Sequence, residues 1–400
     1  MSAIQAEQIQ QRAQEMLPWL TSVRRDFHQY PELGMEEFRT QEKIIGYLEE
    51  IGIPFYKAAG TGVVGLIQGG LPGAAVALRG DMDALPIDEV NDTAYRSKIG
   101  GKMHACGHDA HMTCLLGAAR ILSEHKELLP GTVKLFFQPA EETVGGALPM
   151  IREGVLENPR VEACFGLHVS PELPVGKIAV KYGQMNASSD DLHITVRGEN
   201  GHGAYPHKGR DAIVIAAHVI TALQTIVSRN VDPREAAVIT LGVISGGTAG
   251  NILAREVKLT GTIRTLDKLV RASVKQRVRE VAELTAKSLG GEATVELEEG
   301  YTSLINNKAM VDLVKRCGET MLGAEQVRVN DFPMMGVEDF AFFAEHVPSA
   351  FYHLGVRNEA AGCTYPVHHP LFDLDESSLA VGAAMQAFNA WTFLQERAEK

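Results

Sequence analysis

The sequence predicts an α/β protein in which a largely parallel sheet belongs to one domain and a smaller α+β domain is inserted into it. Short apolar runs alternate with helical stretches through roughly the first 180 residues, and this pattern changes from about residue 185. The length of 400 residues also exceeds a comfortable single domain. We therefore expect two domains.

The first part of the chain shows the pattern of helices followed by buried strands. Apolar residues recur at helical spacing from Ile4 to about Tyr30 and from Glu36 to Glu50. After Gly52 and Pro54, short apolar runs bounded by Gly and Pro are typical of buried strands. The expected strands are 63–68, 74–80, 132–138 and 162–169, and the expected helices between them are 110–124 and 146–153. This alternation predicts a largely parallel sheet covered on both faces.

The middle of the chain predicts a different kind of domain. Its expected elements are a strand at 190–198, a helix at 211–229, strands at 236–247 and 255–265, a helix at 268–290 and a strand at 292–300. The order strand, helix, strand, strand, helix, strand is that of a ferredoxin-like α+β unit. We expect this inserted domain to span 183–300 and the first domain to comprise 1–182 and 301–400, closing with a helix at 376–399.

Composition narrows the kind of partner. There are 38 basic and 50 acidic residues, which give a net charge of −12. This balance argues against nucleic acid as the main partner and favours a small molecule. The longest apolar segment, "AIVIAAHVITAL", is too short to span a membrane and contains His218. The N-terminus lacks the pattern of a secretory signal, and five scattered cysteines do not resemble a disulfide framework, so we expect a cytoplasmic protein.

Residues that can bind metals gather where the expected strands end. The segment "MHACGHDAH", residues 103–111, holds three histidines, one cysteine and one aspartate just before an apolar helix. Further donors follow strands or lie in a Pro-bounded loop: Asp81, Asp83, Glu141, Glu142, His168, His368 and His369. Because ligands bind beyond the carboxyl ends of the strands in open α/β sheets, these donors are expected at one rim.

Each donor alone has a simpler explanation. Asp81 could cap a turn, His168 could be a buried core histidine, and a pair of glutamates is ordinarily solvated. Cys106 is different because it lies between two histidines and Gly107 allows a tight turn, so Cys106 and His108 can aim at one point. A redox role for Cys106 is disfavoured because no second cysteine has C-x-x-C spacing.

The joint occurrence of these donors favours a metal site. A thiolate, several imidazoles and carboxylates suit zinc, manganese, cobalt or nickel. The set exceeds what one catalytic ion needs, so we expect two divalent metal ions per subunit. Of the adjacent glutamates, one can bind metal while the other acts as a base toward water. His111, one helical turn after His108, is expected to pack or to support the site.

The motifs together resemble those of the metal-dependent N-acyl-amino-acid amidohydrolases, which include hippurate hydrolases, auxin-conjugate hydrolases, aminoacylases and related carboxypeptidases. The resemblance runs from about residue 24 to the C-terminal helix and rests on "RRDFHQYPELGMEEFRT", "RGDMDALPI", "MHACGHDAH", "FFQPAEE", "GLHV", "GHGAYPH", "GGTAGNILAREVKLTGTIRT", "MMGVEDFAFF" and "HHPLFDLDE". It implies a zinc-peptidase-like catalytic domain with an inserted lid or dimerisation domain, and hence a homodimer.

The resemblance also implies a role for each matching residue. The implied metal ligands are Cys106, His108, Glu142, His168 and His368. The family pattern His-x-Pro selects His368 rather than His369. Glu141 is the implied general base. Other branches of the family carry His-x-Asp where this chain has Asp81-Met82-Asp83, so Asp83 is implied to support the site. In the lid, His202 is implied to reach the scissile carbonyl, and Asn251 and Arg264 to hold the carboxylate of the substrate.

The expected function is metal-dependent hydrolysis of the amide bond of N-acyl amino acids by a metal-activated water, with Glu141 as base. Alternatives with the same chemistry are a carboxypeptidase or dipeptidase acting on short peptides, and an N-acetyl-diaminopimelate deacetylase. An alternative of another class is a non-catalytic metal-binding protein. Glu141 argues against that alternative, because a protein that only held metal would not need the base.

Overall fold

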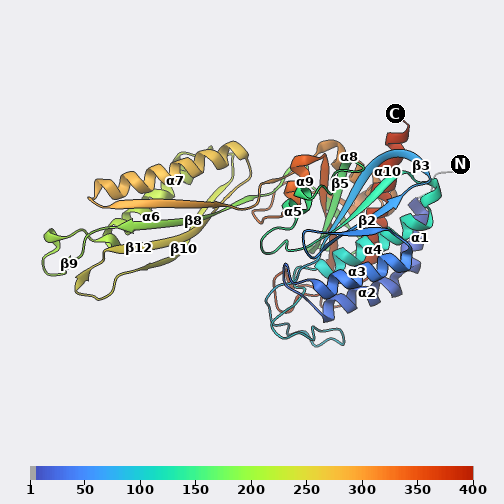
Figure 1. Cartoon of the computed structure of the whole chain (residues 1–400), viewed down its shortest axis with the longest axis horizontal. Helices are drawn as coiled ribbons and strands as arrows, with labels where there is room; N and C mark the ends of the chain where they lie inside the picture. The colour runs from blue at the N-terminus through green and yellow to red at the C-terminus, as the bar shows by residue number, and fades with distance from the viewer. Residues whose placement is uncertain (1–5, 400) are drawn as a thin grey trace. The chain divides into compact units, whose positions relative to one another are not determined.

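The computed structural model describes residues 6–399 and divides into two compact units (Figure 1). Unit 1 comprises Met1–Gly183, Ile305–Phe332 and Phe342–Lys400, and unit 2 comprises Gln184–Leu304 and Pro333–Ala341. The short strands β7 (Gly183–Asn186) and β14 (Leu304–Asn306) lie where the chain passes from one unit to the other.

Unit 1 is built on an eight-stranded mixed sheet with the order β1-β2-β4-β3-β5-β16-β6-β15. Its strands are β1 (Phe55–Ala58), β2 (Gly62–Gln68), β3 (Leu71–Asp81), β4 (Pro130–Gln138), β5 (Val161–Pro174), β6 (Ile178–Val180), β15 (Val327–Val329) and β16 (Ser349–Arg357). The four central strands β4, β3, β5 and β16 pair in parallel, and β2 joins β4 antiparallel. The predicted α/β fold with a mixed, largely parallel sheet is therefore confirmed.

Helices pack on this sheet. They are α1 (Ala6–Glu15), α2 (Leu17–Gln29), α3 (Phe38–Ile51), α4 (His108–Glu124), α5 (Ala147–Arg152), α8 (Lys308–Leu322), α9 (Phe340–His346) and α10 (Ser378–Ala398), with short 3-10 helices at Lys126–Leu128 and Ala324–Gln326. The helical spacing predicted from Ile4 to Tyr30 is split, because Pro18 starts a second helix, α2. Ile4 itself lies outside the described residues.

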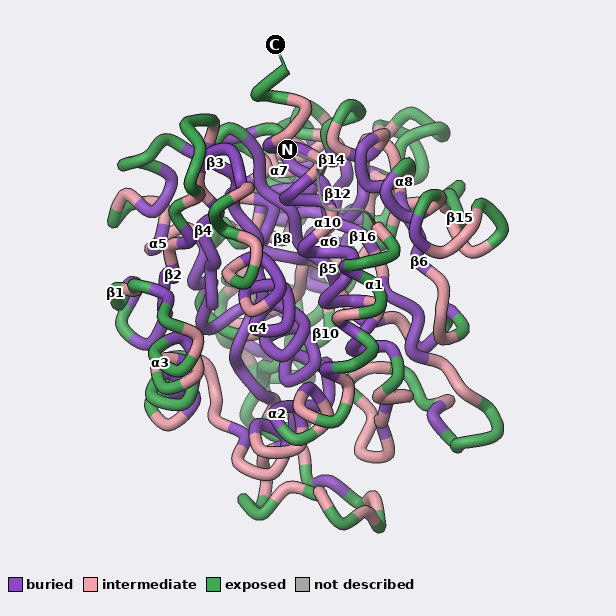
Figure 2. The backbone as a smooth tube through the Cα atoms, turned by 90° about the vertical axis from the view of Figure 1, so that its right-hand side faces the viewer, coloured by how far each residue is buried: buried purple, intermediate pink, exposed green. Residues whose placement is uncertain are grey.

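The helix α4 lies almost entirely in the core of unit 1. Nearly every residue of α4 is buried, and Figure 2 shows its trace in the buried colour. Two glycines let α4 and α10 approach closely. A Cβ on Gly382 would lie 2.4 Å from Sγ of Cys114, and one on Gly117 would lie 2.6 Å from Cβ of Ala383. On the other face of the sheet, Phe136 of β4 stacks on Phe343 of α9.

Unit 2 has a four-stranded antiparallel sheet with the order β10-β12-β8-β13. Its strands are β8 (Ser188–Arg197), β10 (Ala237–Gly246), β12 (Glu256–Thr265) and β13 (Glu292–Glu299), the short pair is β9 (Gly201–His202) with β11 (Ile252–Leu253), and its helices are α6 (Ala212–Arg229), α7 (Lys268–Ser288) and a 3-10 turn at Pro206–Lys208. The main elements follow the predicted ferredoxin-like order.

The two long helices of unit 2 each begin at an aspartate. Asp211 accepts a hydrogen bond from the backbone N–H of Ile213, and Asp267 accepts one from that of Leu269. In length and composition, α6 is the one helix among residues 6–399 that could cross a membrane. Its buried residues, among them Ile215 and Val219, pack in the core of unit 2.

Candidate metal centre

The expected donors of unit 1 lie together at the carboxyl ends of the central strands of its sheet. Asp81 is the last residue of β3, the two glutamates follow β4, and His168 lies on β5, whereas His108 begins α4. The parallel pairing of β3 with β4 and with β5 places these strand ends side by side. Sγ of Cys106 lies 3.3 Å from Nε2 of His168.

The expected ligands fall in three of the overlapping groups of donor atoms, and within each group the atoms lie within 4.8 Å of one another. The groups are Cys106 with His108 and His168; Cys106 with Glu142 and His368; and His108 with Glu141 and Glu142. Cys106, His108 and Glu142 each belong to two of the groups. Donors shared between adjacent groups could hold two metal ions close together.

Left-handed backbone turns orient Cys106, His108 and His368. Gly107 has a φ of +85°, and a Cβ there would lie 2.4 Å from Cγ2 of Val169, so the position requires glycine. His368 also has a left-handed backbone, with a φ of +64°, and its N–H donates to the carbonyl of Ala105 at 2.8 Å. Nε2 of His368 lies 2.9 Å from Oε1 of Glu142.

Asp83 links the histidine at the start of α4 to the turn that carries the glutamates. Its Oδ1 lies 3.2 Å from Nδ1 of His108 and accepts the backbone N–H of Glu141 at 3.0 Å. Its Oδ2 accepts the N–H of Glu142 at 2.9 Å. This placement agrees with a supporting position rather than with a metal ligand, because both carboxylate oxygens are occupied.

His111 is held by hydrogen bonds at both ring nitrogens. Its Nδ1 lies 2.5 Å from Oδ1 of Asp81, and its Nε2 accepts the backbone N–H of Val169 at 2.9 Å. Asp81 also pairs with the buried Arg79, whose Nη1 lies 2.5 Å from Oδ2. These contacts fix the ring of His111 next to the cluster and leave neither nitrogen to bind a metal.

The pKa shift of Cys106 indicates that the negative charge of the cluster would stabilise a bound cation. Burial and then the charges of Glu142 and Glu141 raise the pKa of the Cys106 thiol well above its usual range. Burial and then His111 lower the pKa of His168. A divalent cation reverses the first effect, because it offsets the carboxylate charge and stabilises a thiolate.

His108 gives the most direct test of whether the residues fit a metal. Its Nε2 is buried without a hydrogen-bond partner, while Asp83 engages the other nitrogen. Burial alone would lower the pKa of His108, but the charges of Asp81 and Asp83 raise it to about 10. A buried ring nitrogen that makes no hydrogen bond and lies 3.6 Å from Oδ2 of Asp81, beside a thiol and carboxylates, is in the environment of a metal ligand, so the residues fit.

Two histidines near this cluster, the buried His104 and the half-buried His353, were not assigned a role from the sequence. Both ring nitrogens of His104 are buried without a hydrogen-bond partner. His353 lies on β16, where the parallel register places it beside His168. The strand β16 itself was not predicted, although the apolar run "SAFYHLGV" carried that signal.

The three residues expected in the lid lie in unit 2. His202 is exposed on β9, and Nδ1 accepts the backbone N–H of Ala204 at 3.1 Å. Asn251 is close to it, because the carbonyl of Asn251 accepts the N–H of Gly203 at 2.8 Å. Arg264 is half-buried on the central strand β12, paired with Ser189 of β8. The structure thus brings two of the three together in one loop pair.

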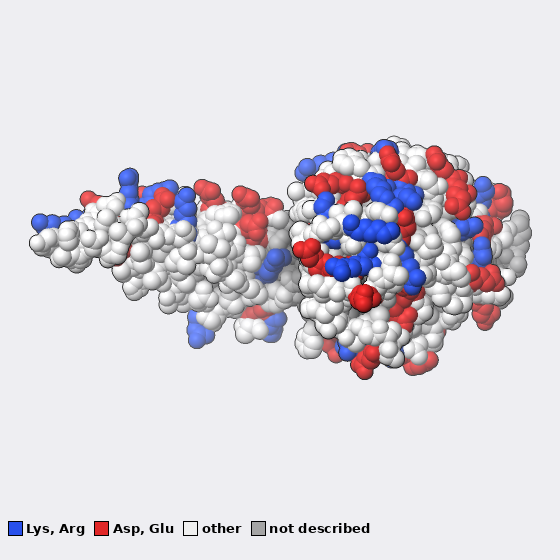
Figure 3. All heavy atoms as spheres, turned by 90° about the horizontal axis from the view of Figure 1, so that it is seen from below, with Lys and Arg blue, Asp and Glu red and all other residues white. Residues whose placement is uncertain are grey.

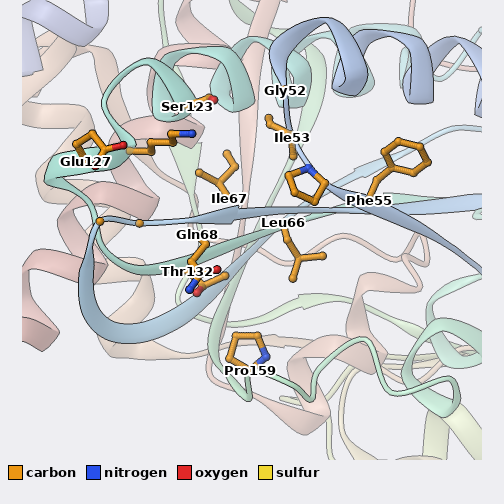
Figure 4. A pocket seen from close by; sticks show the side chains of 14 residues that line it. Gly52, Ile53, Phe55, Leu66, Ile67, Gln68, Ser123, Glu127, Thr132 and Pro159 are labelled. Atoms are coloured by element: carbon orange, nitrogen blue, oxygen red, sulfur yellow. The ribbon is translucent and has the colours of Figure 1, made fainter.

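A separate pocket of about 720 Å³ lies in unit 1 at the end of β2 and the start of β4, away from the donor cluster (Figure 4). It is lined by the end of β2, including Leu66, and by Thr132 near the start of β4. The donor residues of the cluster follow the opposite end of β4. The pocket therefore contains none of the predicted site residues.

Comparisons with known proteins support the resemblance. Residues 77–388 match the model of "Peptidase family M20/M25/M40". The chain is 42% identical to an IAA-amino acid hydrolase of Arabidopsis thaliana (97% of this chain and 88% of the relative) and 41% identical to the N-acetyl-L-cysteine deacetylase of Bacillus subtilis (90% and 84%). It is 38% identical to a thermostable carboxypeptidase of Saccharolobus solfataricus (97% and 98%).

Solved structures agree with the sequence relatives. A putative aminohydrolase from methicillin-resistant Staphylococcus aureus superposes with a TM-score of 0.92 at 32% identity, covering 97% of this chain and 99% of that one. A structure described as a dinuclear metal-binding peptidase of the M20 family, from Bacillus subtilis, gives a TM-score of 0.83 at 33% identity, covering 96% and 99%. The chain therefore belongs to peptidase family M20/M25/M40 and is an amide-bond hydrolase.

Proposed function

We propose that the protein hydrolyses the amide bond between an acyl group and an amino acid whose carboxylate is free. The proposed ligands of two divalent metal ions are Cys106, His108, Glu142, His168 and His368. The observation that carries this proposal is the overlap of the three donor groups through shared residues. The ions are zinc, manganese, cobalt or nickel, which the mixed sulfur, nitrogen and oxygen donor set accepts.

Glu141 is the proposed general base. It is buried and belongs to the same donor group as His108 and Glu142. When bound, the metal ions lower the pKa of water and polarise the amide carbonyl. Glu141 takes the proton of the attacking water and returns it to the departing amine. Asp83 fixes the backbone of Glu141 for this transfer.

Residues of unit 2 are proposed to bind the rest of the substrate. His202 is exposed between two glycines, so its loop can approach a ligand, and its imidazole can donate a hydrogen bond to the developing oxyanion. Arg264 offers a planar group that pairs with a carboxylate through two hydrogen bonds. Asn251 adds an amide donor beside His202. A substrate with a free carboxylate agrees with these donors.

Hydrolysis of peptides is the second candidate. It is favoured by the relatives named as thermostable carboxypeptidases, which are 38% identical over 392 residues. A deacetylase of N-acetyl-diaminopimelate uses the same chemistry. Each alternative needs the same metal centre and the same base, and differs only in the groups around the scissile bond.

A small-molecule partner also agrees with the surface charge in Figure 3. Acidic and basic side chains share the viewed face, and charges of one sign do not cover it.

One assay separates these substrates. The metal-reconstituted protein is incubated with N-acetyl, N-benzoyl and indole-acetyl amino acids, with their carboxamide counterparts and with dipeptides, and release of the amine is measured. We expect the N-acyl amino acids to be hydrolysed faster than their carboxamide counterparts, because the carboxylate is recognised. Equal rates for acids and carboxamides would contradict carboxylate recognition, and faster cleavage of dipeptides would favour the peptidase.

We propose that unit 2 also joins two subunits in a homodimer. The strands β10 and β13 are the edges of its sheet, and β10 exposes Val243 (57%) and Ile244 (60%). The helix α6 exposes Ile213 (47%) and Val214 (51%). An unpaired edge with apolar side chains favours pairing with a second copy. Light scattering that shows only monomers at micromolar concentration would refute the dimer.

A cytoplasmic location is proposed on the state of the cysteines. All five are free and buried, including Cys106, whose thiol the site needs in its reduced form. A reducing compartment preserves such thiols. Cell fractionation with an antibody against the protein tests this location, and recovery in an extracellular fraction would contradict it.

A further inference from the structure

The segment "PELGMEE", residues 31–37, packs against the turn that carries the two glutamates of the site. Glu37 is fully buried in this contact. Its Oε1 accepts the backbone N–H of Ala140 at 2.8 Å, and its Oε2 accepts the hydroxyl of Thr61 at 2.5 Å. A residue distant in sequence thus binds the backbone immediately before Glu141.

Glu37 is not used to cap the helix that it precedes. It occupies the N-cap position of α3 but makes no side-chain hydrogen bond there. Glu32 satisfies that helix end instead, because its carboxylate accepts the N–H groups of Arg39 at 3.1 Å and Thr40 at 2.8 Å. Burial of Glu37 therefore needs another explanation, since burial of a carboxylate is costly. Burial raises the pKa of Glu37 to about 7.

The turn that Glu37 contacts is strained. Ala140 has a φ of +56°, a left-handed conformation that costs a non-glycine residue on the order of 1 kcal/mol and persists only when its surroundings enforce it. Three consecutive N–H groups are held by carboxylates. Glu37 accepts that of Ala140, and Asp83 accepts those of Glu141 and Glu142.

Residues 31–37 also pack closely against the turn at Ala140 through Gly34. A Cβ on Gly34 would lie 2.2 Å from Oγ1 of Thr143 and 3.0 Å from Cα of Ala140. Only glycine at residue 34 allows the segment to approach the turn this closely. The left-handed conformation of Ala140 reverses the chain between β4 and the glutamates, so the two carboxylates enter the donor cluster from a fixed backbone.

We propose that Glu37 is a positioning residue, which holds the left-handed turn at Ala140 so that Glu141 and Glu142 reach their separate places in the metal centre. Glu37 and Asp83 divide this task, since Asp83 binds the two N–H groups that follow. The roles of Glu141 and Glu142 in this inference rest on the proposed function. The inference itself concerns the geometry of the turn, which metal affinity reports without any substrate.

The experiment compares Glu37→Leu, Glu37→Gln and the control Glu32→Leu. The control removes a carboxylate from the same segment without touching the turn. Zn²⁺ affinity of the metal-free protein is measured by competition with a chelator, and kcat and KM are measured at saturating metal. We expect Glu37→Leu to weaken Zn²⁺ binding by roughly 10- to 100-fold and to lower kcat by about 100-fold, with KM changed less than about threefold.

Glu37→Gln is the conservative variant. Its amide oxygen still accepts the N–H of Ala140, and its NH₂ group donates to Oγ1 of Thr61, so we expect metal affinity and kcat within about threefold of the parent protein. Glu32→Leu is expected to lower the melting temperature while metal affinity and kcat stay unchanged. Unchanged Zn²⁺ affinity in Glu37→Leu, or equal losses in Glu37→Leu and Glu32→Leu, would overturn the proposal.

A second variant covers the case in which Glu37→Leu does not fold. Gly34→Ala pushes on Thr143 and Ala140 of the turn and leaves every carboxylate in place. We expect the same combined loss of Zn²⁺ affinity and kcat, and a fully active Gly34→Ala protein would contradict the inference. If the parent protein hydrolyses none of the substrates, the proposed function fails, while the Zn²⁺ titrations still decide the role of Glu37.

Discussion

At the scale of single residues, two adjacent glutamates are proposed to have different tasks, and their backbone positions differ in surroundings. The N–H groups of both are bound by Asp83, and the preceding Ala140 is left-handed. Glu142 lies 2.9 Å from His368, whereas Glu141 is the more buried of the two. Burial would raise the pKa of Glu142, but the hydrogen bond with His368 and the charge of His108 lower it. A lowered pKa favours the ionised form of Glu142, which its proposed role as a metal ligand requires.

The variants Glu141→Gln and Glu142→Gln test this division. Glu141→Gln should retain both metals and lose activity by roughly two to four orders of magnitude, the usual contribution of general acid–base catalysis. Glu142→Gln should lower metal occupancy and regain part of its activity at high metal concentration. Metal analysis beside kinetics decides between them. If Glu141→Gln loses metal and Glu142→Gln does not, the two roles are reversed.

Much of the donor cluster was predictable, because strand ends can be recognised in sequence. Asp81, Glu141 and His168 each follow or end an apolar run, and the parallel topology brings such positions together. Glu37 and His353 were missed for different reasons. The proposed role of Glu37 depends on a contact with Ala140 about 100 residues away, and His353 lies on a strand that was not predicted.

At the scale of elements, a buried ionic network ties α2 to the start of α4. Arg24 of α2 is fully buried, and its Nε donates to Oδ2 of Asp109 at 2.8 Å. It also donates to Asp373 at 3.1 Å, and His28 lies 2.7 Å from the same Asp109 oxygen. Asp109 directly follows His108, so this network fixes the helix end that carries a proposed metal ligand.

Removal of Arg24 should therefore destabilise the protein strongly. Arg24→Met leaves Asp109 buried without its cation, and we expect a loss of about 3–5 kcal/mol in the free energy of unfolding. The matched control is Arg25→Met, because Arg25 is 43% exposed and pairs only with Glu376 at 2.6 Å among the ion pairs of the described chain. Its loss should stay below about 1 kcal/mol. Denaturant unfolding of both variants measures the difference, and equal losses would contradict the role of the network.

The same network predicts how stability depends on pH. Burial alone would raise the pKa of Asp109, but Arg24 and His28 outweigh it and hold this pKa well below its usual range. The pKa is lower in the folded than in the unfolded protein, so its contribution to stability is present above about pH 4, the unfolded value, and is lost as pH falls further.

Unfolding measured between pH 6 and pH 2.5 tests this pH dependence. The free energy of unfolding of the parent protein should fall with decreasing pH below about pH 4. In Asp109→Asn the slope should be smaller, because the group with the lowered pKa is gone. Identical slopes for the two proteins would contradict the assignment.

At the scale of the whole molecule, the sequence predicted the fold class but not every strand. The apolar runs of β3, β4 and β5 and the long buried helix α4 were recognisable, because periodicity and length distinguish them. The antiparallel direction of β2 was not predictable, since an apolar run does not encode the direction of its neighbour. The short strands β6 and β15 have three residues each, too few for a periodic signal.

The grouping of Pro333–Ala341 with unit 2 is another feature that local patterns cannot supply. The segment follows unit 1 in sequence, and its backbone pairs with unit 2 through Met334, whose N–H donates to Met185 at 2.8 Å. Such a contact joins residues about 150 positions apart. The expected boundaries of 183–300 did not include this segment, and they stay a prediction for the inserted domain.

The most direct test of the account is metal content and activity measured on the same samples. The protein is stripped of metal by a chelator, verified as metal-free, and titrated with Zn²⁺, Mn²⁺, Co²⁺ or Ni²⁺ while hydrolysis of an N-acyl amino acid is followed. The account predicts no turnover in the stripped protein and recovery that reaches its maximum at two ions per chain. Full activity at negligible metal content would contradict it.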